Sequence, residues 1–82
     1  SIENARRALA GQLRAAGVEE AELDARILVG AAVGLDLTEL ISQAGRPLTA
    51  AEAARLVQHE KRRIAGEPVA RILGTREFWG LP

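Results

Sequence analysis

The chain has 82 residues and a mass of 8.7 kDa, which allows one small domain and excludes a second independent core. Its 11 Lys and Arg residues balance 11 Asp and Glu residues, so no global field concentrates nucleic acid or anionic membrane on it. The absence of cysteine and methionine excludes disulfides, thiolate metal sites and a thiol nucleophile. Apolar residues make up 48% of the chain, but alanine is the commonest of them and only Phe78 and Trp79 are aromatic. We therefore expect a thin, aliphatic core.

No segment has the features of a membrane anchor or a leader. The longest nearly uninterrupted apolar run, residues 27–35, has about half the length that a bilayer requires, and residues 1–16 lack the profile of a signal peptide. We expect a soluble, cytoplasmic protein without membrane contacts. Because the chain begins without methionine and ends two residues after a Trp-Gly pair, we also expect it to be part of something longer.

Two amphipathic helices are predicted in the first half of the chain. The first begins after Ser1, ends at Gly17 and carries one apolar stripe at three- and four-residue steps. The second ends at Gly34, and its residues 27–33 are apolar nearly all round, which indicates a central helix covered on two sides. The stripe of the first helix consists of Ile2, Ala5, Leu9, Leu13 and Ala16, and the buried face expected for the second consists of Leu23, Ile27, Leu28 and Ala31.

Acidic residues gather at the start of this second helix. Negative charge is favourable there because it meets the positive end of the helix dipole. A metal site would need several carboxylates or histidines on one face, and none is within reach by sequence. Dipole compensation is therefore the better explanation for Glu19, Glu20, Glu22 and Asp24.

Two capping boxes mark further helices. Asp36 with Glu39 predicts a short helix through about Gln43, and Thr49 with Glu52 predicts a longer one that ends at Gly66. Pro68 suits the first position of a fifth, short helix that ends at Gly74. The longer helix is expected to bury Ala53, Leu56, Val57 and Ile64 and to leave Arg55, His59, Arg62 and Arg63 mostly outside.

Short connections make consecutive helices neighbours in space. The sequence therefore predicts an all-α fold, a small bundle of about five helices over residues 1–74. Residues 75–82 are expected to form an extended carboxy-terminal connector segment.

Reactive side chains are scarce. His59 is the only imidazole, and the neighbouring Glu60 points about 100° away on a helix, so we expect a solvent-exposed structural histidine rather than a general base. Most hydroxyls lie at helix ends or turns, where they are expected as caps. We expect no catalytic, cofactor-binding or metal-binding residue in this chain.

Basic and aromatic residues gather in the second half of the chain. The cations that end the fourth helix compensate its dipole without a ligand, or they offer a surface to an acidic protein or to nucleic acid. RNA is disfavoured because no aromatics are interleaved with the basic residues. The paired aromatics either clamp the chain end onto the domain or belong to an interface with whatever follows. The candidate partner or interdomain contacts are Arg62, Arg63, Arg71, Arg76, Phe78 and Trp79.

Residues 62–81 resemble the signature that joins the amino-terminal domain of the HemK/PrmC family to its catalytic domain. They read Arg-Arg-Ile-Ala-Gly-Glu-Pro-Val-Ala-Arg-Ile-Leu-Gly-Thr-Arg-Glu-Phe-Trp-Gly-Leu. The triplet 23–25 with Leu28, and the triplet 46–48, resemble earlier landmarks of the same family. Where many members carry tyrosine, this chain has Arg71.

The resemblance implies a peptide chain release factor glutamine methyltransferase, which uses S-adenosylmethionine to methylate the glutamine of a Gly-Gly-Gln motif. The family's glycine-rich loop and Asn-Pro-Pro-Tyr motif do not occur here, so the resemblance places them after residue 82. It further implies that residues 1–74 are a helical substrate-recognition domain that helps to bind the release factor, and that residues 75–82 begin the connector to the catalytic domain. The segment alone should bind no S-adenosylmethionine and transfer no methyl group.

Two other functions remain to be weighed. The domain could be a structural spacer that stabilises or orients the catalytic domain without contacting substrate. It could also be a helix-turn-helix binder of nucleic acid, but the zero net charge argues against direct nucleic-acid contact.

Overall fold

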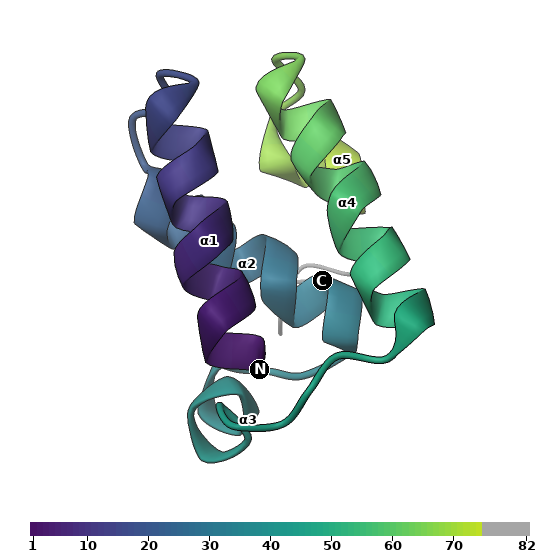
Figure 1. Ribbon diagram of the computed structural model, residues 1–82. Helices are drawn as coiled ribbons and strands as arrows, with labels where there is room; N and C mark the ends of the chain where they lie inside the picture. The colour runs from purple at the N-terminus through teal and green to yellow at the C-terminus, as the bar shows by residue number, and fades with distance from the viewer. Residues whose placement is uncertain (75–82) are drawn as a thin grey trace.

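Five α-helices and no strand make up residues 1–74, the part of the chain that the computed structural model describes (Figure 1). They confirm the predicted all-α class and the number of helices. The predicted connector at 75–82, with Arg76, Phe78 and Trp79, lies outside the described residues. None of the helices within 1–74 combines the length and the apolar content that crossing a bilayer requires. The helices are α1 (Ile2–Ala15), α2 (Ala21–Val33), α3 (Leu37–Ser42), α4 (Ala50–Ile64) and α5 (Val69–Leu73).

Helix α2 is the centre of the bundle and contacts each of the other four helices. In Figure 1 it runs across the molecule from the α1 side to the α4 side. Gly34 caps its end with a φ of 71°, in the left-handed region that favours glycine. The central position predicted from its apolar residues is therefore confirmed.

The buried face of α2 differs from the predicted one. Leu28 is fully buried, but Leu23 is 45% exposed, and Ile27 and Ala31 are only half-buried. A run that is apolar nearly all round does not specify a single face, so the helices that pack around α2 decide which side is buried. The buried residues of α2 are Ala21, Asp24, Ala25, Leu28, Val29, Gly30, Ala32 and Val33.

The helix starts follow the predicted caps. The Ser1 hydroxyl accepts a hydrogen bond from the backbone N–H of Asn4. In α3 and α4, both predicted capping boxes are formed reciprocally, by Asp36 with Glu39 and by Thr49 with Glu52. Each such cap stabilises a helix by about 1 kcal/mol. Pro68 does not begin α5 but precedes it as the capping residue.

The start of α1 is also closed by residues far along the chain. The backbone N–H of Ile2 donates to the carbonyl of Arg46 at 2.8 Å, and the N–H of Glu3 donates to the carbonyl of Ala44 at 3.0 Å. These are two of the four amides that a helix leaves unpaired at its first turn. The segment that follows α3 is thereby fixed to α1. The Arg46 guanidinium in turn pairs with Glu52 of α4 at 3.1 Å.

Helix α4 is the clearest departure from the sequence prediction. Of the four apolar residues expected to face the core, only Leu56 is buried, while Ala53, Val57 and Ile64 are exposed. Of the polar residues expected outside, Arg55 is exposed as predicted, but the other three approach the bundle. Arg62 and Arg63 are half-buried, and so is His59, whose Nε2 atom is enclosed.

The prediction of a solvent-exposed His59 is therefore wrong. His59 lies three residues after Leu56 and four before Arg63, which puts all three on one side of the helix. This side of α4 faces the bundle because its arginines find partners there. Hydrophobic periodicity cannot identify a face that packs mainly through polar groups.

The core is thin and aliphatic, as the composition predicts. Its buried hydrophobic residues are alanine, leucine, isoleucine and valine. They form a single cluster to which all five helices contribute. The largest fully enclosed side chains are Ile2, Leu13, Leu28 and Val29.

Two leucines of α2 test which face of this helix is buried. Leu28→Ala should lower the free energy of unfolding by about 2–5 kcal/mol, because it removes a fully buried side chain. Leu23→Ala should cost less than about 1 kcal/mol, because that side chain is already half in water. Urea unfolding followed by circular dichroism measures both, and equal losses would contradict the observed orientation of α2.

Candidate functional site

Two arginines of α4 hold α2 near its two ends. The Arg63 Nε donates to the Asp24 Oδ2 at 3.0 Å, close to the start of α2. The Arg55 Nε donates to the carbonyl of Ala32 at 3.0 Å, close to its end. Asp24 and Ala32 are eight residues apart on α2, and Arg55 and Arg63 are eight residues apart on α4. At the normal helical rise each interval is about 12 Å, so the two arginines are spaced to reach both acceptors. Because α2 has no basic residue in its own last turn, Arg55 supplies the positive charge that this end favours.

Three of the predicted contact residues converge on Glu67, in the turn between α4 and α5. Arg62 forms a bidentate pair with the Glu67 carboxylate, at 2.8 and 3.0 Å, and also donates to the carbonyl of Ile72 at 3.4 Å. Arg63 donates to the Glu67 backbone carbonyl. Hydrogen bonds from Arg62 lower the pKa of Glu67, and the positive charge of the exposed Arg71 lowers it further. The basic cluster therefore fastens α5 to the end of α4.

This placement limits what Arg62 and Arg63 can offer to a partner. Both are half-buried, and their strongest hydrogen bonds already go to carboxylates of this domain. Arg71 is exposed in the last turn of α5. Direct contact of these three arginines with a partner remains a prediction. Arg76, Phe78 and Trp79 lie outside the described residues.

A cleft of about 690 Å³ opens beside the Arg63–Asp24 pair. It lies between the turn that follows α1 and the end of α4, and α5 also contributes to it. Leu23 and Ile64, which are 45% and 46% exposed, present apolar surface there, and Glu19 and Glu20 add carboxylates. Neither of these glutamates forms an ion pair with another residue in 1–74. The cleft therefore combines apolar surface with spare negative charge.

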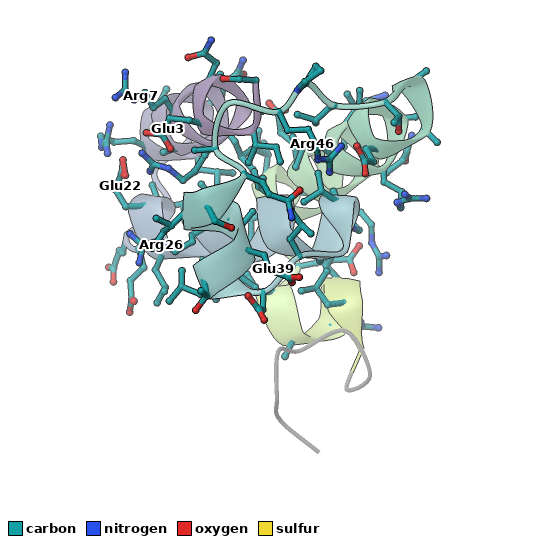
Figure 2. The ribbon with its side chains drawn as sticks, turned by 90° about the horizontal axis from the view of Figure 1, so that it is seen from below. Glu3, Arg7, Glu22, Arg26, Glu39 and Arg46 are labelled. Atoms are coloured by element: carbon teal, nitrogen blue, oxygen red, sulfur yellow. The ribbon has the colours of Figure 1, made fainter. Side chains whose placement is uncertain are left out.

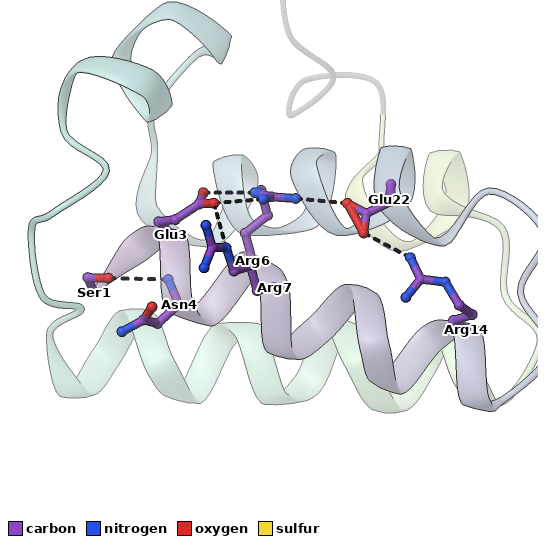
Figure 3. A network of polar contacts seen from close by, with 7 residues as sticks. All are labelled: Ser1, Glu3, Asn4, Arg6, Arg7, Arg14 and Glu22. Atoms are coloured by element: carbon purple, nitrogen blue, oxygen red, sulfur yellow. Dashed lines mark hydrogen bonds and ion pairs between the residues drawn. The ribbon is translucent and has the colours of Figure 1, made fainter.

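A second network ties α1 to the start of α2 (Figure 3). The Arg6 guanidinium bridges Glu3, at 2.8 and 2.9 Å, and Glu22 of α2, at 3.0 Å. Arg14 reaches the other oxygen of Glu22 at 2.9 Å, and Arg7 donates to Glu3 at 3.0 Å. Hydrogen bonds from Arg6, aided by Arg7, lower the pKa of Glu3 to about 2. Of the four acidic residues at the start of α2, Glu22 and Asp24 thus form specific ion pairs.

Some of these ion pairs could be predicted from the sequence and others could not. Glu3 with Arg6 and Arg7 has the three- and four-residue spacing of helical ion pairs. Asp24 and Arg63 are 39 residues apart, and no local pattern connects them. In the described part of the chain, no three histidine, aspartate or glutamate side chains lie close enough together to hold a metal ion.

Fold and site together define a small all-helical domain whose arginines are used largely for internal contacts and whose surface carries an apolar, acidic cleft. Comparison with known families identifies it further. The PrmC N-terminal domain family matches residues 4–74, and the chain belongs to that family.

The relatives carry a common name. A release factor glutamine methyltransferase from Bradyrhizobium diazoefficiens is 77% identical over 82 residues, which is all of this chain and 28% of that protein. Proteins of the same name from Agrobacterium fabrum and Burkholderia pseudomallei are 46% and 52% identical, over 85% and 72% of this chain and 24% and 21% of their own length. No solved structure matches. The resemblance found in the sequence is confirmed, and the chain spans about a quarter of these relatives.

The ion pair between α2 and α4 is open to a direct test. Arg63→Gln should lower the free energy of unfolding by about 1–3 kcal/mol, because it leaves the buried Asp24 carboxylate without its counter-charge. Lys61→Gln removes an exposed cation from the same turn and should change stability by less than about 0.5 kcal/mol. Similar unfolding midpoints in urea for the two variants would show that the pair does not hold α4.

Acid should weaken the network around Arg6. Because folding lowers the pKa of Glu3 from 4.5 to about 2, its stabilising effect is complete above pH 4.5 and is lost as the pH falls through about 2. Glu3→Gln should therefore lower the melting temperature at pH 7 and make little difference near pH 2. Glu19→Gln, at an exposed residue outside the network, is the matched control. A Glu3→Gln effect that is the same at both pH values would contradict this assignment.

Proposed function

We propose that residues 1–74 are the non-catalytic amino-terminal domain of an S-adenosylmethionine-dependent methyltransferase. The whole protein would methylate the glutamine of the Gly-Gly-Gln motif of peptide chain release factors in the cytoplasm, and this domain would help to bind the release factor. Residues 75–82 would begin the connector to the catalytic domain, which would hold the cofactor. The support for this activity is the family membership and the shared name of relatives that match the chain.

The observation that carries the recognition role is the cleft beside the Arg63–Asp24 pair. Leu23 and Ile64 are large apolar side chains left about half exposed at its edge, and a few buried apolar anchors supply most of the energy of a typical protein interface. The spare carboxylates of Glu19 and Glu20 favour a partner with basic groups and repel phosphate. A protein surface therefore fits the cleft better than nucleic acid does.

A second role, that of a spacer, also has an observation in its favour. Arg62 joins the end of α4 to Glu67 and to the Ile72 carbonyl of α5, and Gly74 at the end of α5 leads into residues 75–82. These bonds hold α5, the last described helix, against the end of α4. The domain could thus orient the catalytic domain even without touching the substrate.

Substitutions in the cleft of the full-length enzyme test recognition. Leu23→Ser with Ile64→Ser should raise KM for the release factor about 10-fold and leave kcat nearly unchanged, because both residues act only in binding. The melting temperature should change little, since both side chains are already half exposed. Val57→Ser, equally exposed but outside the cleft, is the control. An unchanged KM in the double variant would refute recognition through the cleft.

The spacer role predicts a different response. Arg62→Gln should then lower kcat, because the catalytic domain would be misplaced, while the affinity for the release factor stays the same. Removal of residues 1–66 is a poorer test, because it would uncover Val69, Ile72 and Leu73, which are buried against the rest of the bundle.

A further inference from the structure

The surface around α3 holds a second hollow, separate from the cleft. This α3 groove has a volume of about 370 Å³, which lies within the range of roughly 300–1,000 Å³ found for ligand pockets. Its apolar lining includes Val29, Leu37, Leu40 and Ile41, from α2 and α3, and Arg6 and Arg26 add charge. Figure 2 views the molecule from the α3 side, with Glu3 and Arg26 labelled.

Helix α3 leaves two of its three large apolar side chains exposed. Leu40 packs into the core, but Leu37 is 44% exposed and Ile41 is 74% exposed, the largest exposure among the big hydrophobic residues in 1–74. Both exposed side chains line the α3 groove. Apolar residues gathered around a hollow are typical of a binding surface, whereas single exposed ones are common anywhere.

The charges around the groove are unbalanced. Glu3 and Arg6 pair with each other, and Arg6 also pairs with Glu22. Arg26 makes no ion pair with any residue in the described part of the chain. The groove therefore has one spare positive charge beside its apolar surface, and a guanidinium binds a carboxylate with two directed hydrogen bonds.

Hydrogen bonds hold both ends of α3, which forms one wall of the groove. The Asp36–Glu39 capping box fixes the start of α3, and the backbone bonds from Ile2 and Glu3 fix the segment that follows it. A preformed surface loses less conformational entropy on binding.

We propose that the α3 groove docks a segment of the release factor in which a large apolar side chain lies next to a carboxylate. This inference rests on the proposed function and adds a second contact to the cleft. Leu23 in the cleft and Arg26 in the groove are three residues apart on α2, so they are neighbours on the helix surface and one partner can cover both hollows.

Titration of the full-length enzyme with a full-length release factor tests the proposal. Ile41→Ser and Arg26→Glu should each weaken binding about 10-fold, and only Arg26→Glu should also reduce the salt dependence of the affinity. Val57→Ser and Lys61→Glu are the matched controls, because they change exposed residues of the same kinds on α4, outside the groove. Melting temperatures close to wild type would confirm that all four variants fold.

The outcomes separate this proposal from the proposed function. If the groove variants bind like the controls while Leu23→Ser with Ile64→Ser binds weakly, the groove proposal is wrong and recognition through the cleft stands. If neither set changes affinity, both are wrong. A wild-type dimer in analytical ultracentrifugation that Ile41→Ser dissociates would assign the groove to a second copy of the chain and would also overturn the proposal.

Discussion

The attachment of α4 to α2 through arginine side chains sets the position of α4, of the cleft beside it and of the α5 helix that follows. Helix α4 buries only Leu56 and so has little apolar surface with which to hold its place. Arg55 and Arg63 add the attachment that apolar packing does not provide, because they form hydrogen bonds near opposite ends of α2. Arg62 then extends the attachment to α5 through Glu67 and the Ile72 carbonyl. The α4 wall of the cleft is thus placed by hydrogen bonds more than by packing, whereas α5 also packs through Val69, Ile72 and Leu73.

The sequence predicted the helices well because their signals are local. Two capping boxes, the glycines that end the helices and the apolar stripe of α1 each involve residues within a few positions of one another. The buried faces of α2 and α4 were predicted poorly for two reasons. The apolar run of α2 has no unique face. The inward side of α4 is polar, so hydrophobicity predicted a buried Val57 and an outward Arg63, whereas Val57 is exposed and Arg63 pairs with Asp24.

The candidate site was predictable only in part. Basic residues at the end of α4 stand out in the sequence, but their convergence on Glu67 depends on how the turn before α5 folds. The cleft and the α3 groove are made by residues from several helices, and no linear pattern brings Leu23 near Ile64 or Arg26 near Ile41. Family membership supplies the biological context, and the geometry indicates which surfaces of the domain can serve it.

The bonds that close the start of α1 bear on how this chain forms during translation. The amides of Ile2 and Glu3 emerge from the ribosome early, but their acceptors at residues 44 and 46 emerge only after two further helices have been made. Until then, the first turn of α1 can offer these amides only to water. The first turn of α1 therefore reaches its final hydrogen-bonded state only after residues 44–46 have been made.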